Sequence, residues 1–138
     1  MTEIGARILA ASSLADLLSA SFDAFEAIRV LARDCETRDP ALFAAFLATA
    51  DAAVDGREAI TAAPALHPEG ADVTPASSSE TVTGVAEAAD WLAALGALLS
   101  ERLSQAAART WESADRAACQ EAAHAAGRVH DLMARRRM

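Results

Sequence analysis

Five side chains of this sequence could bind a soft metal ion. They are Cys35, Cys119, His124, His130 and Met133. Thiolate, imidazole and thioether groups are ligands that copper and zinc take in proteins. His124 follows Cys119 by five residues and His130 follows His124 by six, and neither is the four-residue interval that places two ligands on one helix face. A metal would therefore have to be held between helices, and its candidate ligands are Cys35, Cys119, His124 and His130.

Glu121 and His124 form a Glu-x-x-His motif. In ferritin-like bundles two such motifs, with a Glu from each of the other helices, hold a di-iron centre. This chain has one copy, because neither His67 nor His130 has a Glu three residues before it. A pair on the helix surface is the interpretation we favour, and no di-iron site is predicted.

Motifs of an activated nucleophile are missing from the sequence. It contains no G-x-S-x-G elbow and no glycine-rich phosphate loop. Arg29 and Arg57 lie near apolar stripes and could together hold a buried anion, but Arg stems commonly extend from such positions to water. We therefore predict a protein that is not an enzyme, with no catalytic residue and no cofactor unless copper is bound.

The elements that carry these residues are predicted to be helices. Ala supplies 38 of the 138 residues, whereas Gly and Pro number only 6 and 4. Strong helix formers dominate, and the turn-forming residues are too few for an all-β domain. Apolar residues recur at intervals of three and four, which predicts helices over residues 2–36, 40–63, 78–108 and 110–136.

Polar residues suggest where the first two helices begin and break. The pair Ser12 and Ser13 is a point where the first helix could break, because Ser competes for backbone hydrogen bonds. Asp39 followed by Pro40 is a cap and first residue typical of a helix start. The buried stripe of this second helix is predicted to include Phe43.

The second half of the chain begins with a loop over residues 64–77. Ser77 and Glu80 have the spacing of a capping box, which predicts the next helix start. Thr110 is the expected N-cap of the last helix, although one continuous helix through this point is an alternative. Short connections favour antiparallel neighbours, so we predict an all-α single domain over residues 1–138, an antiparallel up-down-up-down four-helix bundle with this long loop between helices two and three.

Charge and composition exclude several classes. The net charge is −8, from 20 acidic residues against 12 Arg and no Lys, which argues against nucleic-acid binding. The longest uncharged stretch, residues 40–50, is far below the roughly 18 residues that span a membrane. Two cysteines are too few for a disulfide scaffold, and the N-terminus does not resemble a signal peptide. We therefore expect a cytoplasmic protein that binds neither nucleic acid nor membranes.

Two predicted helices have apolar faces wider than one core requires. Within residues 78–108 these side chains are Trp91, Leu92, Leu95, Leu98, Leu99 and Leu103. Within residues 2–36, Leu9, Leu17 and Leu31 likewise lie outside the main apolar stripe. The last helix differs, because its buried stripe, which starts with Trp111 and Ala114, is expected to consist mostly of Ala. Because a wide apolar face needs a second surface to cover it, we predict a homo-oligomer, as a dimer, with Trp91 or Trp111 near the seam.

The layout resembles the four-helix-bundle copper storage proteins over residues 21–134. The resemblance rests on apolar residues at threes and fours before Cys35, and on the segment 118–126 followed by His130 and Met133. In that family many cysteines line the bundle and their thiolates bind Cu(I). Here the inward positions are mostly Ala, Phe, Leu or Ile, and only Cys35 and Cys119 could remain from such a set.

Three functions follow as hypotheses. The first is a self-associating interaction or scaffolding module, indicated by the wide apolar faces. The second, implied by the resemblance, is a copper-handling bundle with few ligands. The third is a binder of a small apolar ligand, in space beside the Ala-rich last helix.

Overall fold

The structure, a computed structural model, describes residues 3–66 and 84–135 and is helical throughout its regular elements. The described residues form five α-helices, two 3-10 helices and no strand. The α-helices are α1 (Glu3–Ala10), α2 (Leu14–Glu36), α3 (Phe43–Thr61), α4 (Val85–Arg109) and α5 (Ser113–Ala134). The 3-10 helices are η1 (Pro40–Leu42) and η2 (Pro64–Leu66). The all-α class is therefore confirmed.

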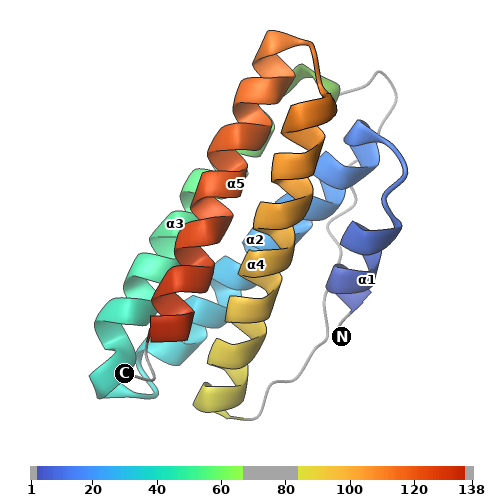
Figure 1. Cartoon of the computed structure of the whole chain (residues 1–138). Helices are drawn as coiled ribbons and strands as arrows, with labels where there is room; N and C mark the ends of the chain where they lie inside the picture. Colours follow the sequence, from blue (N-terminus) through green and yellow to red (C-terminus); the bar gives the residue numbers. More distant parts are fainter. Residues whose placement is uncertain (1–2, 67–83, 136–138) are drawn as a thin grey trace.

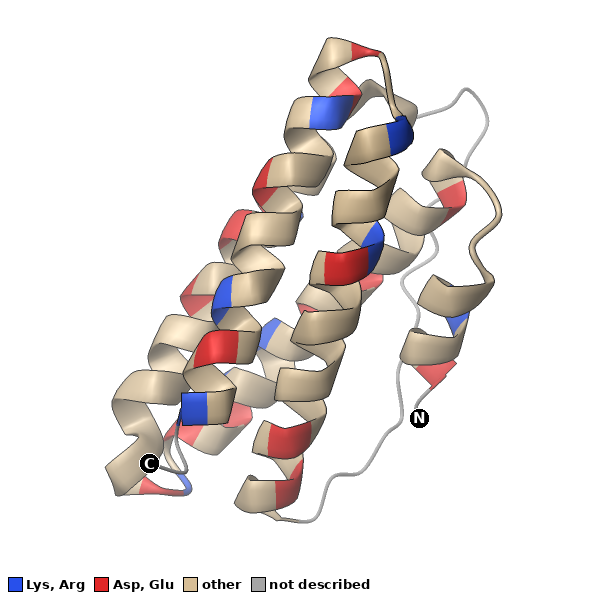
Figure 2. Ribbon diagram, in the orientation of Figure 1, with Lys and Arg blue, Asp and Glu red and all other residues tan. Residues whose placement is uncertain are grey.

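The four long helices lie beside one another (Figure 1). α4 packs mainly on α5, α2 on α3, and α3 on α5, while the short α1 contacts α2 and α4. None of the described helices combines the length and apolar character needed to cross a membrane. Arg and acidic residues are distributed along the helices (Figure 2).

The segment predicted as one helix over residues 2–36 is two helices. Ser13 is extended at φ −132° and ψ 163°, and its Oγ accepts a hydrogen bond from the Asp16 backbone N–H at 3.1 Å. The serine hydroxyl thus caps a new helix instead of continuing the old one. As a separate element, α1 buries Ile4 and Ile8, which are 5% and 0% exposed.

The chain also breaks between α4 and α5, with a different cap from the one predicted. Thr110 is the C-cap of α4, and its hydroxyl donates to the Ala106 carbonyl at 2.7 Å. The N-cap of α5 is Glu112, whose carboxylate accepts from the N–H groups of Ala114 and Asp115 at 3.2 and 2.8 Å. The prediction of Thr110 as N-cap is wrong because its hydroxyl is used by the preceding turn.

The predicted loop over residues 64–77 begins as the 3-10 helix η2. Its Ala65 N–H donates to the buried Asp115 carboxylate of α5 at 3.0 Å, and Leu66 is buried. The rest of this loop, and the capping box of Ser77 and Glu80, lie outside the described residues. The described part of the next helix begins at Val85, after Gly84 in an extended conformation.

Burial departs from the predicted stripes at two aromatic residues. Phe43 is 44% exposed and Trp111 is 88% exposed, so the prediction that they are buried is wrong. Phe43 is the first residue of α3, and Trp111 lies in the turn between α4 and α5. Both positions are at helix ends, where the helical period no longer sets which side chains face the core. Ala114, in the first turn of α5, is likewise exposed.

Two glycines let helices approach closely. A Cβ at Gly56 would overlap the ring of Phe25, so α2 packs an aromatic ring directly on the α3 backbone. A Cβ at Gly96 would lie 2.8 Å from the His130 N and 2.9 Å from the Ala126 carbonyl oxygen. The backbones of α4 and α5 are therefore nearly in contact at this point.

Candidate functional site

The two cysteines are buried thiols in different helices. Cys35 is the penultimate residue of α2 and Cys119 lies in the second turn of α5, and both are 0% exposed and free. Loss of solvation raises the pKa of both thiols, and that of Cys119 reaches about 11 with a smaller contribution from the nearby Asp115 carboxylate. Both are therefore protonated near neutral pH, which disfavours them as nucleophiles.

The two candidate histidines of α5 have different surroundings. His124 is exposed, whereas His130 is partly buried. The Nδ1 of His130 lies 3.1 Å from the Ala93 carbonyl oxygen and donates to it, because a carbonyl can only accept. His130 thus ties α5 to α4, next to the close approach at Gly96.

The described residues do not gather the candidate ligands into a metal site. Nowhere in the ranges 3–66 and 84–135 do three or more His, Cys, Asp or Glu residues form a group that could hold a metal ion. Two cysteines, one near the end of α2 and one near the start of α5, also do not form the many-thiolate lining that the copper storage resemblance implies. The copper hypothesis stays a prediction, and this part of the chain adds no support to it.

Arg29 and Arg57 share an internal anion, the carboxylate of Glu26. The Arg29 Nε and Nη2 lie 3.2 and 3.1 Å from the two carboxylate oxygens, and Arg57 of α3 forms an ion pair with the same group. The hydrogen bond from Arg29, followed by the contribution of Arg57, lowers the pKa of Glu26. The anion site that these arginines could form is therefore occupied by a residue of the protein.

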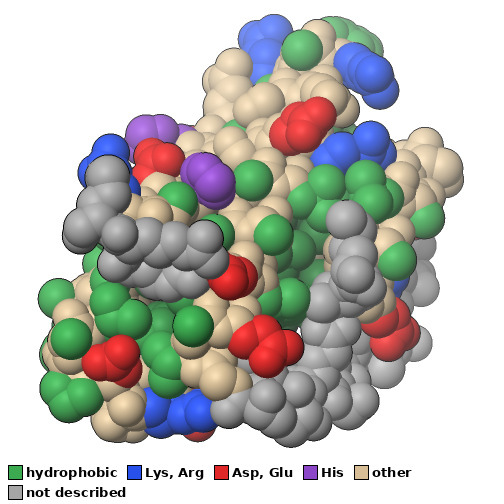
Figure 3. Space-filling model, turned by 60° about the horizontal axis from the view of Figure 1, so that its bottom comes forward, with side chains coloured by type: hydrophobic (Ala, Val, Ile, Leu, Met, Phe, Trp, Pro, Cys, Tyr) green, Lys and Arg blue, Asp and Glu red, His purple; other side chains and the backbone are tan. Residues whose placement is uncertain are grey.

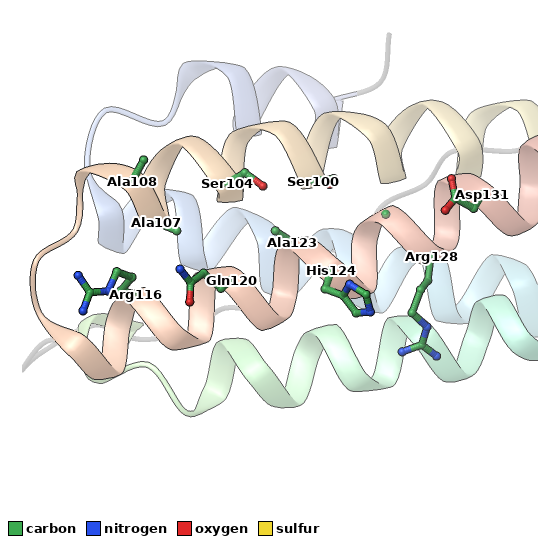
Figure 4. A pocket seen from close by; sticks show the side chains of 11 residues that line it. Ser100, Ser104, Ala107, Ala108, Arg116, Gln120, Ala123, His124, Arg128 and Asp131 are labelled. Atoms are coloured by element: carbon green, nitrogen blue, oxygen red, sulfur yellow. The ribbon is translucent and has the colours of Figure 1, made fainter.

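A groove of about 730 Å³ runs between α4 and α5 (Figure 4). From α4 its lining residues are Ser100, Ser104, Ala107 and Ala108. From α5 they are Arg116, Gln120, Ala123, His124, Gly127, Arg128 and Asp131. The groove combines small side chains with a row of hydrogen-bonding and charged ones.

The charged residues of the groove differ in what they bind. Arg128 turns toward α3 (Figure 4), where its Nη1 lies 3.0 Å from the Asp55 carboxylate. Arg116 and Asp131 lie at opposite ends of the lining of α5, and neither forms a salt bridge with another residue of the described ranges. Such a lining favours a hydrogen-bonding occupant over the small apolar ligand considered from the sequence.

Of the residues that the sequence singled out as ligands, the groove includes only His124. The others that matter here, Arg116, Gln120 and Asp131, were not selected by any motif. The sequence does contain a pattern that points to these residues. Arg116, Gln120 and His124 follow one another at intervals of four, which places them on one helix face.

Large apolar side chains also remain exposed elsewhere. They are Leu9 (48%), Val30 (57%), Phe43 (44%) and Trp111 (88%). On the face formed by the lower ends of the helices in Figure 1, hydrophobic side chains lie between charged and histidine side chains (Figure 3). The surface is thus mixed, with hydrophobic groups available to a partner.

Comparison with known proteins gives no relative: no protein-family model, curated protein or solved structure matches the chain.

Proposed function

We propose that this protein is a non-enzymatic interaction module that associates with itself through its helices. The observation that carries the proposal is the α4–α5 groove, which is open and includes Ser, Ala and Gly side chains in its lining. Small side chains let a further helix approach closely, and a groove between two helices is a recurring way to bind a third. Polar groups along it can then set the register of the bound helix.

Trp111 lies in the connection that joins α4 to α5, and its exposure supports an interface that involves these two helices. It lies two residues before the start of α5 and is 88% exposed. Tryptophan is enriched in protein interfaces because it has a large apolar surface and one hydrogen-bond donor. We keep Trp111, rather than the half-buried Trp91, as the tryptophan near the seam of the oligomer.

We also propose that α2, α3, α4 and α5 form an antiparallel up-down-up-down bundle, to which α1 is added. Support comes from the short connections: three residues join α4 to α5, and six residues, 37–42, join α2 to α3, of which the last three form η1. Such links favour antiparallel neighbours. For its compartment we propose the cytoplasm, and the support is that both cysteines are free thiols.

The experiment that tests self-association is native mass spectrometry of the full chain at micromolar concentration, with copper present during expression. We expect the mass of a metal-free dimer. A monomer at every concentration would overturn the proposal. Additional mass in steps of one copper ion would overturn it in favour of the metal-handling hypothesis.

A further inference from the structure

Most of the α5 residues that line the groove are placed symmetrically along the helix about one point. That point lies between Ala123 and His124, which both line the groove. Gln120 lies three residues before Ala123, and Gly127 lies three residues after His124. An interval of three keeps a residue on the same helix face, so the four positions form one strip.

The symmetry continues one turn further out in each direction. Arg116 lies seven residues before Ala123, and Asp131 lies seven residues after His124. The strip therefore has a cation at one end and an anion at the other, equally far from its midpoint. Arg128 is the one α5 lining residue outside this pattern, and it already binds Asp55 of its own chain.

We propose, building on self-association as the proposed function, that this groove is the interface of a homodimer in which two α5 helices pair antiparallel across a two-fold axis. A two-fold interface requires a patch that is complementary to itself. In an antiparallel pair, positions equally far from the midpoint face each other. Arg116 then faces Asp131 of the second copy, and this contact occurs twice.

The central part of the strip fits the same arrangement. Gln120 faces Gly127 of the second copy, where the missing side chain leaves room for the longer one. Ala123 is only 5% exposed, so the exposed His124 of the second copy lies over it, again a large residue opposite a small one. Small-to-large pairing on both sides of the axis is what close helix packing requires.

Charge favours a second copy over an unrelated acidic partner. At a net charge of −8, two copies repel each other in general, and opposite charges placed at matching positions offset part of that repulsion. Arg116 and Asp131 supply them, and neither forms a salt bridge among the described residues of its own chain. Arg116 also lies near the exposed Glu112 one turn away, where its charge contributes slightly to lowering the pKa of that carboxylate. An acidic helix from another protein would meet Arg116 but be repelled by Asp131.

The first test exchanges the two charges. Sedimentation velocity over a range of concentrations gives the dimer Kd of the wild type, Arg116→Asp, Asp131→Arg and the double variant. We expect each single change to raise the Kd by about tenfold and the double variant to return close to the wild type. Asp131→Arg changes the net charge from −8 to −6, which alone would tighten the dimer, so its weakening reports the local contact.

The matched control is Asp51→Arg, which makes the same change of charge at an exposed position of α3 outside the groove. We expect this variant to dimerise at least as tightly as the wild type. Circular dichroism and thermal unfolding of every variant separate a weakened interface from a damaged fold.

The second test places a cysteine near the axis. In the proposed pair the two copies of position 124 are offset by one residue, about 1.5 Å, whereas the copies of position 120 are offset by seven residues, about 10 Å. A disulfide needs Cα atoms within about 7 Å. Oxidised His124→Cys should therefore form a cross-linked dimer, and Gln120→Cys should remain uncross-linked, while the native Cys35 and Cys119 stay buried.

The outcomes separate this inference from the function on which it rests. A wild-type chain that stays monomeric overturns both. A wild-type dimer that is insensitive to the charge exchange, or that cross-links equally well from positions 120 and 124, keeps self-association and overturns this interface.

Discussion

At the scale of single residues, the Glu26 carboxylate is notable because it binds two arginines. It lies on α2, next to Arg29 of its own helix, and it also binds Arg57 of α3. One carboxylate thus joins a local pair to a contact between two helices. Since its side chain is 31% exposed, water screens part of the interaction, and the contribution to stability is modest.

Replacing Glu26 with Gln should lower the free energy of unfolding by about 1 kcal/mol at pH 7. The pKa of Glu26 is lowered in the folded protein, so its stabilising effect is fully present above the ordinary value of 4.5 and is lost as the pH falls through the lowered value. The difference between wild type and Glu26→Gln should therefore shrink below pH 4.5. Urea unfolding at pH 7 and at successively lower pH measures it.

The control for this prediction is Glu58→Gln, on an exposed position of α3. It should change stability little at either pH. Equal losses from Glu26→Gln and Glu58→Gln, or a Glu26 effect independent of pH, would contradict the role given to the pair of arginines.

At the scale of elements, α4 and α5 approach each other more closely at Gly96 than at Gly127. A Cβ at Gly96 would meet the backbone of α5 at 2.8 Å, whereas a Cβ at Gly127 would lie 3.6 Å from the Ser100 Oγ, an ordinary contact. Both residues are inside helices, where Ala is preferred over Gly by about 1 kcal/mol. On helix preference alone, a change from Gly to Ala should stabilise the protein at both positions. Packing predicts instead that the change is tolerated at Gly127 and destabilising at Gly96.

We expect Gly127→Ala to raise the free energy of unfolding by about 0.5–1 kcal/mol and Gly96→Ala to lower it by about 1–3 kcal/mol. The cost at Gly96 arises because its close neighbours are backbone atoms, which move only if a whole helix moves. Denaturant unfolding at low protein concentration, where association contributes least, measures both. Stabilisation by both variants would show that α4 and α5 are further apart than described.

At the scale of the whole molecule, α1 is an added element that closes one side of the bundle. Its Ile8 is fully buried, while the adjacent Leu9 is 48% exposed. Arg7 of α1 also forms an ion pair with Asp23 of α2 at 2.9 Å. The docking of α1 thus combines an apolar anchor with a polar contact.

Ile8→Ala should destabilise the protein by about 2–5 kcal/mol, because it removes a buried side chain and leaves a cavity. Leu9→Ala is the matched control and should cost less than about 0.5 kcal/mol, as expected for surface positions. Thermal and urea unfolding of the two variants compare them directly. Similar effects at both positions would show that α1 is not held against the bundle as described.

The sequence determined the all-helical class and much of the local structure. Intervals of three and four between apolar residues are enough to predict helices, and side-chain caps act within a few residues of the chain. For that reason Ser13 and Asp39 could be recognised as boundary residues, and both accept backbone hydrogen bonds. Ser13 caps α2, whereas Asp39 caps the 3-10 helix η1, and the α-helix expected to begin at Pro40 begins three residues later at Phe43. Most of the expected core, including the Ala-rich face of α5, followed from the same periodicity.

Only the tertiary structure decided which polar and small residues meet across helices. Glu26 with Arg57, Asp115 with Ala65 and His130 with Ala93 are pairs separated by 31, 50 and 37 residues. No local pattern relates such positions, because their distance depends on how whole helices pack. The candidate metal ligands remained scattered for the same reason, and the α4–α5 groove became visible only when two helices were placed side by side.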